Sequence, residues 1–360
     1  MRILHLSSER SWRGGEQQIS YLVEVLRSRG VRCEIAAREN SAMAERHPES
    51  LPLPFRGEWD LYTAYRIRQI VREKNIDLVH AHTGHGHTLA VLAASLGMRA
   101  PVVVSKRTDY PVRDNAFSRW KFNHSAIKAF LCVSDKIRQI LARDLARPEL
   151  AQTVYSGINL QRFPEAPAQD IRSLLGLPAE ARVVISTGAL AEQKDIPTLL
   201  AVAAKLVPHH PDLHFALCGD GPLATEMKKL AATLGVSSRV HFLGFRSDLP
   251  SFLGSADCFL ITSKDEGLGT SIIDAFAVGL PVVATAAGGI PELVRHAQTG
   301  LLAQVGDVDM LATHTENMVY IAGGLKSELL HNAQKKAQEF SYIQTASKTL
   351  EVYQKILSHP

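Results

Sequence analysis

Asp265-Glu266-Gly267-Leu268-Gly269-Thr270-Ser271-Ile272-Ile273-Asp274 is the stretch that decides the fold, because it places two acids around a turn that contains glycine. Cys258–Thr262 before it has the continuous apolar pattern of a buried strand, and Ser271–Val278 after it has helical spacing. The turn therefore opens a helix. Backbone N–H groups at the start of a helix, together with the helix dipole, favour an anion such as a diphosphate.

The two acids of this stretch suggest a role beside that anion site. Asp274 lies about two helical turns after Glu266, so we expect both on one face. Two acids flanking a diphosphate would hold hydroxyls at either end of a nucleotide sugar, with the hexose at Glu266 and the ribose at Asp274. The alternative is a solvated helix start whose acids only complement the dipole.

Further glycine loops stand in order on both sides of this stretch. Downstream come a strand at Pro281–Thr285, the segment Ala286–Val294 and Thr299–Leu302. Upstream come the loops Ser186–Asp195, Leu217–Pro222 and Val240–Phe245. A single glycine loop is weak evidence, whereas five in order are specific. Together they resemble the retaining nucleotide-sugar glycosyltransferases of family 4, which carry two acids separated by seven residues, and the resemblance covers nearly the whole chain.

The resemblance implies a set of site residues. Lys194 and Glu266 match the positions that act on the diphosphate and the sugar, and we expect them to be catalytic. The expected donor-binding residues are Gly14, Gly15, Gly188, Gly219, Gly221, Gly244, Phe245, Gly269, Thr270, Ser271 and Asp274. No cofactor is expected beyond the nucleotide-sugar co-substrate.

Three positions depart from the family pattern. Ala189 stands where an arginine is usual, so one expected diphosphate cation is missing and Lys194 carries more of that role. Asp274 replaces the usual glutamate and is one methylene shorter. Arg107 stands where many members have a histidine, which suggests that Arg107 and Asp109 bind a different donor or acceptor.

Length and periodicity predict two α/β domains. A chain of 360 residues exceeds what one core usually serves. Apolar strands alternate with helical segments in both halves, which predicts parallel sheets covered by helices, with ligands at the carboxyl ends of the strands. Two such domains facing a cleft form the fold called GT-B. We expect an acceptor domain at 1–164 joined by a terminal helix at about 341–360, and a nucleotide-sugar domain at 165–340.

The first half carries a second candidate loop and a group of histidines. Arg13–Glu16 contains Gly14 and Gly15 and opens a helix, and the alternative is an ordinary tight turn. His80, His82, His85 and His87 do not have a metal-ligand spacing with a carboxylate, so we expect no metal. At the end of a strand, His82 and His85 are better interpreted as acceptor-binding residues, together with Arg107 and Asp109.

Charge is divided unequally along the chain. Residues 1–165 hold 25 Lys and Arg against 17 Asp and Glu, a net charge of +8, and the remainder has −4. This favours an anionic glycolipid acceptor or a membrane surface, contacted by one predicted helix from Arg113 through Arg119 and Lys121 to Lys128. An ordinary solvated helix is equally compatible with this pattern. Nucleic acid is not expected, because no nucleic-acid-binding motif accompanies the charge.

The four cysteines are predicted in strands without a metal or disulfide spacing, which indicates small core residues in a reducing compartment. No apolar run has the length of a membrane span, and Met1–Leu6 is too short for a signal sequence. We therefore expect a cytoplasmic protein that is at most peripheral on the inner face of the cytoplasmic membrane.

The expected reaction is transfer of a sugar, with retention and without a metal, to a hydroxyl of a glycan or glycolipid, in lipopolysaccharide or other envelope polysaccharide synthesis. Two alternatives stay open. A GT-B nucleotide-sugar epimerase would need no acceptor, and a non-catalytic nucleotide-sugar-binding subunit would explain Ala189 but not Lys194 and Glu266. The nucleotide, the sugar and the acceptor do not follow from the sequence.

Overall fold

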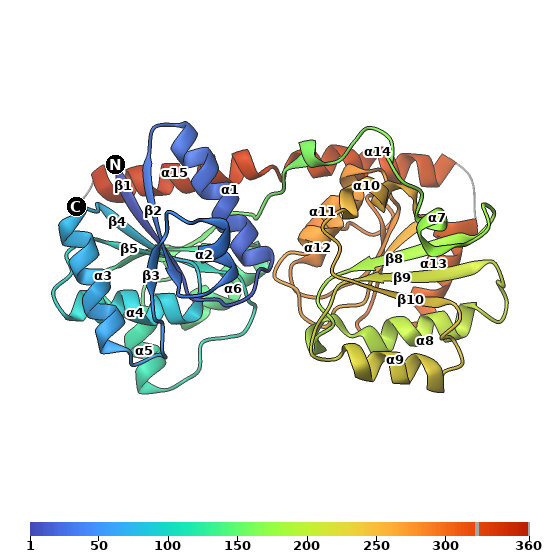
Figure 1. The fold of residues 1–360 in the computed structure, drawn as a ribbon, viewed down its shortest axis with the longest axis horizontal. Coiled ribbons are helices and arrows are strands. Elements are labelled where there is room, and N and C mark those ends of the chain that lie inside the picture. Colours follow the sequence, from blue (N-terminus) through green and yellow to red (C-terminus); the bar gives the residue numbers. More distant parts are fainter. Residues whose placement is uncertain (321–323, 359–360) are drawn as a thin grey trace. The chain divides into compact units, whose positions relative to one another are not determined.

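The computed structural model describes residues 1–320 and 324–358 (Figure 1). They form two compact units. The first contains residues 1–157 together with the segment from Tyr342, and the second contains Ile158–Ser341. The division falls earlier than the predicted 164/165 boundary because the Ile158 N–H donates to the Phe340 carbonyl oxygen (2.9 Å) and Ile158 forms a bridge with Ser341. Residues 158–164 are thereby attached to the second unit.

The first unit is a parallel sheet between two layers of helices. Its strand order is β3-β2-β1-β4-β5-β6-β7, so the order reverses between β1 and β4. The strands are β1 (Arg2–Ser7), β2 (Arg32–Arg38), β3 (Leu51–Leu53), β4 (Leu78–Ala81), β5 (Val102–Lys106), β6 (Ile127–Cys132) and β7 (Ala151–Thr153). The helices are α1 (Gly14–Ser28), α2 (Ala42–Arg46), α3 (Leu61–Glu73), α4 (Gly84–Ser95), α5 (Ala116–Asn123), α6 (Asp135–Asp144), the 3₁₀ turn η1 (Pro148–Leu150) and α15 (Tyr342–Ser358).

The second unit repeats this architecture with the strand order β10-β9-β8-β11-β12-β13, which reverses between β8 and β11. Its strands are β8 (Arg182–Thr187), β9 (Leu213–Cys218), β10 (Val240–Gly244), β11 (Cys258–Ile261), β12 (Val282–Thr285) and β13 (Leu301–Ala303). Its helices are α7 (Ile171–Leu175), α8 (Ile196–Leu206), α9 (Ala224–Thr233), α10 (Leu249–Phe252), α11 (Thr270–Ala277), α12 (Ile290–Leu293), α13 (Val308–Tyr320) and α14 (Gly324–Gln338). Short 3₁₀ turns are η2 (Leu160–Arg162), η3 (Glu192–Lys194) and η4 (Leu253–Ser255).

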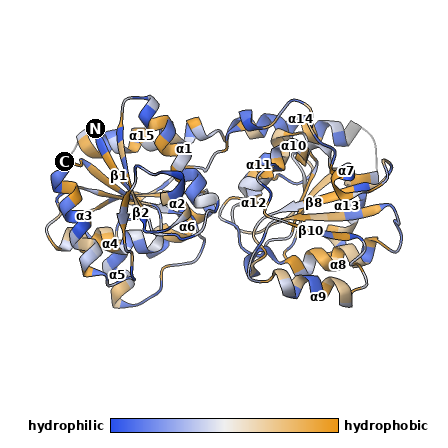
Figure 2. Ribbon diagram, in the orientation of Figure 1, coloured by the Kyte–Doolittle hydropathy of each residue, from blue (hydrophilic) through white to orange (hydrophobic). Residues whose placement is uncertain are grey.

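Each sheet carries its own hydrophobic core. In the first unit α1 and α15 pack on one face of the sheet, where Tyr353 is fully buried. In the second unit α8, α9 and α13 contribute to the core against β8 and β9. Figure 2 shows the result, with mostly apolar strands inside and helices that carry both apolar and polar residues. Parallel strands covered on both faces explain the continuous apolar runs in the sequence.

The two predicted α/β domains with parallel sheets are confirmed, and the predicted strands lie within a residue or two of the observed ones in most cases. All four cysteines are free and buried in strands. The prediction of one helix from Arg113 to Lys128 was wrong: α5 ends at Asn123 and Lys128 lies in β6. None of the helices described is long and apolar enough to cross a membrane.

Candidate active site

Three loops of the second unit meet at the carboxyl ends of β8, β9 and β10, next to the reversal of strand order between β8 and β11. The Gly188 N–H after β8 donates to the Cys218 carbonyl oxygen (3.0 Å), and the Gly219 N–H after β9 donates to the Gly244 carbonyl oxygen (2.8 Å). These bonds bring the ends of β8, β9 and β10 together. In open α/β sheets, ligands bind at the carboxyl ends of strands at such a reversal point.

The close contact of two of these loops requires glycine. A Cβ atom on Gly219, whose φ is +158°, would lie 1.7 Å from the Gly188 carbonyl oxygen. Gly221 is similarly close to the next segment, with a Cβ position 2.5 Å from the Leu190 carbonyl oxygen. The glycine spacing of the sequence therefore reflects backbone packing between the loops as well as access for a ligand.

Lys194 and Glu266 form an ion pair at this edge of the sheet, between η3 and the loop after β11. Both side chains are more than four-fifths buried. The Ser263 hydroxyl donates to Glu266 Oε2 (3.3 Å), and the Gly289 N–H donates to the Glu266 carbonyl oxygen (2.9 Å). A cation and a carboxylate, predicted separately from two motifs, thus lie side by side and hold each other in place.

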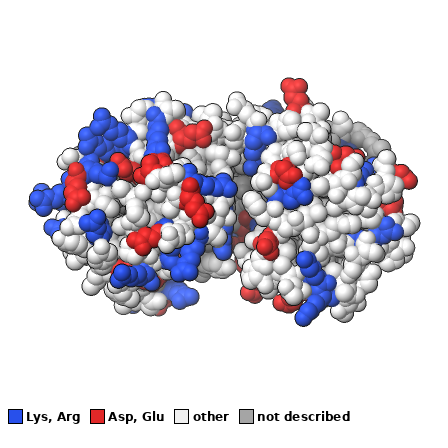
Figure 3. Space-filling model, viewed as in Figure 1, with Lys and Arg blue, Asp and Glu red and all other residues white. Residues whose placement is uncertain are grey.

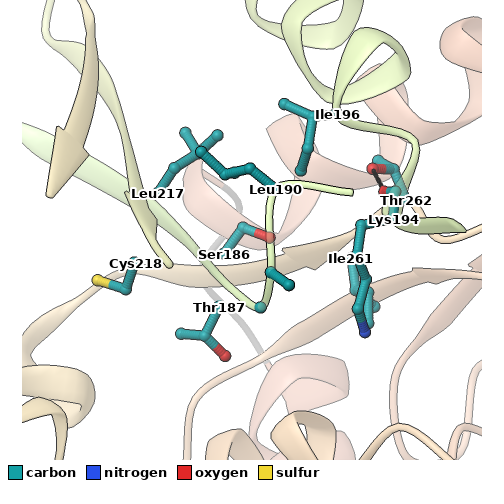
Figure 4. A pocket seen from close by; sticks show the side chains of 11 residues that line it. Ser186, Thr187, Leu190, Lys194, Ile196, Leu217, Cys218, Ile261 and Thr262 are labelled. Atoms are coloured by element: carbon teal, nitrogen blue, oxygen red, sulfur yellow. Dashed lines mark hydrogen bonds between the residues drawn. The ribbon is translucent and has the colours of Figure 1, made fainter. Parts of the chain in front are cut away.

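A small pocket opens beside this pair, lined by Ser186, Thr187, Gly188, Ala189, Leu190, Lys194, Ile196, Leu217, Cys218, Ile261 and Thr262. Figure 4 shows Lys194 next to Thr262, with Ser186 and Thr187 on the other side. The Thr262 hydroxyl donates to the carbonyl oxygens of Lys194 (3.1 Å) and Asp195 (3.0 Å), which fixes the lysine loop against β11. Lys194 is the only Lys or Arg among these lining residues.

The helix predicted after Glu266 is α11, with Gly269 as its N-cap. Thr270 and Ser271 in its first turn are partly exposed, and Asp274 is buried. Asp274 is not isolated, because Arg162 forms an ion pair with its carboxylate (2.5 Å between Nη2 and Oδ2). Burial raises the pKa of Asp274 and the Arg162 charge opposes that rise. Phe245, after β10, is 69% exposed, as an aromatic platform for a base would be.

In the first unit, Arg107 lies next to the glycine pair Gly14-Gly15 at the start of α1. The Arg107 side chain lies over Gly15, with its Cδ atom 3.8 Å from where a Cβ would be. Glu16 next to it is buried and its carboxylate accepts from the Arg13 N–H (3.1 Å). Burial lowers the pKa of Arg107 to about 10, against the opposing charge of Glu16. The guanidinium is therefore a cation at the end of β5.

Arg107 also lines a small cavity of mixed polar and apolar character at the carboxyl ends of the strands, with Gln18, Leu22, His80, His82, Ser105, Leu131, Val133, Val154, Ser156, Thr345 and Thr349. His82 of the predicted acceptor set therefore does share a cavity with Arg107. His85, in contrast, is exposed in the first turn of α4 and is not among these lining residues. Asp109 follows β5 in a partly exposed loop, where its charge acts on Lys106.

A chain of hydrogen bonds joins three buried histidines. His5 Nδ1 lies 3.0 Å from His82 Nε2, and Ser105 Oγ lies 3.3 Å from His82 Nδ1 and 2.9 Å from His80 Nε2. Their ligand atoms lie within 4.8 Å of one another, so they are the three residues that could hold a metal ion in the described part of the chain. Burial lowers the pKa of His5 to about 3. The histidine cluster has no carboxylate and faces the charge of Arg107, which favours a neutral hydrogen-bonded network over a cation site.

The predicted basic surface of α5 needs a correction at Lys121. This side chain is only 8% exposed, and its Nζ donates to the Gly84 carbonyl oxygen at the start of α4 (3.0 Å). Lys121 therefore holds two helices together and cannot face a membrane. Arg113 and Arg119 stay exposed, and Figure 3 shows Lys and Arg side chains over much of the visible face of the first unit.

Two family models match the chain in succession. The model of Glycosyltransferase Family 4 matches residues 12–162, and the model of Glycosyl transferases group 1 matches residues 168–340. The chain belongs to the family 4 glycosyltransferases. A glycosyltransferase therefore contains the features described above: the reversals of strand order, the glycine loops and the Lys194–Glu266 pair.

Curated relatives support this glycosyltransferase assignment, and solved structures support the fold. The N-acetyl-alpha-D-glucosaminyl L-malate synthase of Bacillus anthracis is 27% identical and the match covers 81% of this chain and 77% of that protein. LpsE of Rhizobium meliloti, a lipopolysaccharide core biosynthesis glycosyltransferase, is 38% identical over 41% of this chain and 42% of its own. Anabaena Alr3699/HepE in complex with UDP and glucose has a TM-score of 0.84 at 24% identity, covering 99% of this chain and all of that one. The structural likeness establishes the GT-B fold.

Sequence reasoning missed several residues of this glycosyltransferase. Ser263 and Gly289 fix Glu266, yet the double glycine of Ala286–Val294 was recognised without being given a role. Arg162 lay at the end of the predicted acceptor domain, and its sequence pattern gave it no role. His5 sits in β1 and is joined to His82 only by the fold. Of these residues, only Gly289 had a signal in the sequence: it belongs to the Gly-Gly pair before Ile290-Pro291, and such a pair indicates that two backbone segments come close together.

Proposed function

We propose that this glycosyltransferase moves a sugar from a nucleotide-sugar donor to a hydroxyl of a glycan or glycolipid acceptor, with retention at the anomeric carbon and without a metal ion. The observation that carries the proposal is the Lys194–Glu266 pair beside the glycine loops at the β8/β11 reversal point. A diphosphate needs a cation and N–H donors, and a sugar needs a carboxylate that accepts from its hydroxyls.

Each residue of the pair has a distinct part in the proposed reaction. The bond from the anomeric carbon to the diphosphate oxygen breaks, and its electron pair stays on that oxygen. Lys194 and the N-terminus of α11 stabilise this growing negative charge, and Glu266 holds the sugar hydroxyls. The acceptor oxygen bonds to the anomeric carbon on the face that the diphosphate leaves, and its proton passes to the departing phosphate oxygen. No side chain forms a covalent intermediate.

The donor site is assigned to the second unit and the acceptor site to the first. In the second unit the proposed donor-binding residues are Gly188, Gly219, Gly221, Gly244, Phe245, Gly269, Thr270, Ser271 and Asp274. Gly14 and Gly15, at the start of α1 in the first unit, stay a prediction from the sequence. The cavity with Arg107 and His82 would receive the acceptor. His85 and Asp109, which do not line this cavity, stay proposed acceptor contacts. LpsE makes lipopolysaccharide core a reasonable acceptor class, and the HepE complexes make UDP the first nucleotide to test.

The test of this function is sugar transfer that depends on an acceptor. UDP-, GDP-, ADP- and CMP-sugars are incubated with lipopolysaccharide core oligosaccharide, and both the nucleotide and the glycan product are measured. We expect rapid nucleotide release only with the acceptor present, unchanged by EDTA because Lys194 and α11 supply the positive charge. Release without acceptor would favour the epimerase, and binding without turnover would favour a non-catalytic subunit. Activity lost in EDTA and restored by Mg²⁺ or Mn²⁺ would overturn metal independence.

We further propose that the first unit meets an anionic partner at α5, in the cytoplasm or at the inner face of the membrane. Because Lys121 is buried, the exposed basic residues there are Arg113 and Arg119, and Arg119 forms an ion pair with the exposed Asp114 (2.6 Å). R113Q/R119Q should weaken binding to vesicles of phosphatidylethanolamine and phosphatidylglycerol by about thirtyfold at low salt, since each of the two basic residues at such a surface contributes about 1 kcal/mol. Sedimentation measures the binding. R29Q/R32Q, an equal charge change between α1 and β2, is the matched control. Equal losses in both variants would contradict a specific contact at α5.

A further inference from the structure

Arg162 and Asp274 form an ion pair that connects the start of the second unit to α11. Arg162 ends the turn η2, five residues into this unit, and Asp274 lies in the second turn of α11. Arg162 Nη2 lies 2.5 Å from Asp274 Oδ2, and the guanidinium carbon lies 4.7 Å from the centre of the Phe163 ring. The arginine is therefore held by its own neighbour and by the acid.

Only one oxygen of the Asp274 carboxylate is used by this pair. Among the described residues, Asp274 Oδ1 is buried and has no hydrogen-bond partner, and the same is true of Arg162 Nε. A buried carboxylate oxygen without a donor is costly, since buried polar groups in proteins are nearly always hydrogen-bonded. An oxygen left in this condition is accounted for if a ligand supplies the missing donor.

The position of Asp274 on α11 indicates which ligand that is. Asp274 follows Thr270 by four residues and Ser271 by three, so all three lie on one stripe of the helix. Thr270 and Ser271 are partly exposed, whereas Ile272, Ile273, Ala275 and Phe276 are buried in the core. Asp274 is therefore on the side of α11 that carries the expected diphosphate site. A hydroxyl of a nucleotide bound along Thr270, Ser271 and Asp274 is a hydrogen-bond donor that could reach Asp274 Oδ1.

Without Arg162 the carboxylate would not keep its charge so readily. Burial raises the pKa of Asp274, and the Arg162 charge and hydrogen bond oppose this rise. A protonated acid would lose the strong acceptor character of a carboxylate.

We propose that Arg162 is a positioning residue for donor binding: it holds Oδ2 of Asp274 so that Oδ1 accepts a hydrogen bond from a ribose hydroxyl of the nucleotide. The proposal rests on the proposed function, because it takes the nucleotide to lie along α11. The proposal adds Arg162 to the residues that determine nucleotide binding, although Arg162 need not contact the nucleotide. Arg162 acts through Asp274 and determines whether ribose is distinguished from deoxyribose.

The experiment compares nucleotides that differ only in the ribose. Calorimetry selects the tightest binder among UDP, GDP, ADP and CMP, and then measures its 2′-deoxy and 3′-deoxy forms. We expect the parent protein to prefer the ribose form over at least one deoxy form by about tenfold, the effect of a hydrogen bond to a charged group. R162A and D274A should each reduce this ratio to about one, and the double variant should lose no more than either single variant.

Arg172 provides the matched control, because it forms a buried ion pair with Asp257 in the same unit. R172A should lower the unfolding temperature and leave the ratio between ribose and deoxyribose forms unchanged. R162K should recover part of the ratio. An R162A protein that keeps the parental ratio, or a parent protein that shows no preference, would overturn the proposal while leaving acceptor-dependent transfer intact. Failure of the parent to bind any of the nucleotides would overturn the proposed function itself.

Discussion

Replacing Lys194 by alanine is expected to lower the rate of sugar transfer by about a hundredfold, because the loss of one fixed donor at a site of growing negative charge has effects of this size. The structure supports a large effect, since Lys194 is the only Lys or Arg lining its pocket and Ala189 supplies no second cation. Turnover with saturating donor and acceptor measures the change. The unfolding transition in urea checks that the variant is folded.

Replacing Glu266, the ion-pair partner of Lys194, is a second test of the same site. E266A should also lose activity, through lost orientation of the sugar, and K194A/E266A should lose much less than the product of the two single effects, because the residues contact each other. K205A is the control, since Lys205 pairs with Asp309 on the exposed surface. A folded K194A protein with near-parental turnover would contradict the assignment.

The sequence predicted the parts of the site that are local. Glycine loops, strand ends and the start of α11 are encoded in short segments, and the reversal of strand order places those segments at one edge of each sheet. The close pairing of Lys194 with Glu266 follows from that topology. Both residues come at the ends of the adjacent strands β8 and β11, where a parallel sheet brings its carboxyl ends together.

Contacts between distant segments could not be predicted from the same patterns. Lys121 was interpreted as a surface charge because nothing in its helix shows that its Nζ reaches the Gly84 carbonyl oxygen. Arg162 was predicted only as one of the last residues of the first domain, because Asp274, its partner, is more than a hundred residues away in the sequence. His5 lies in an ordinary apolar strand, and only the pairing of β1 with β4 brings it next to His82. Side-chain partners of this kind depend on the packed fold.

Replacing Gly288 by alanine is expected to damage both stability and transfer. A Cβ atom there would lie 1.9 Å from the Glu266 carbonyl oxygen, and the backbone φ of +50° also disfavours a side chain. The Glu266 loop must move, and the bond from the Gly289 N–H to the Glu266 carbonyl oxygen must lengthen or break. Overpacking of this kind costs about 1–3 kcal/mol of unfolding free energy, which urea unfolding measures. Because Glu266 itself shifts, we expect transfer to fall by about tenfold or more.

G235A is the control for G288A. It reproduces the strain of an alanine at positive φ but not the clash with the Glu266 carbonyl oxygen. Gly235 has a φ of +71°, yet a Cβ atom there would meet nothing within 4 Å. G235A therefore carries the cost of a left-handed alanine, about 1–2 kcal/mol, without displacing a neighbour. It should be destabilised and keep parental turnover. If G288A were no less active than G235A, the Gly288–Gly289 loop would have no part in positioning Glu266, and the carboxylate would have to be fixed by Ser263 and Lys194 alone.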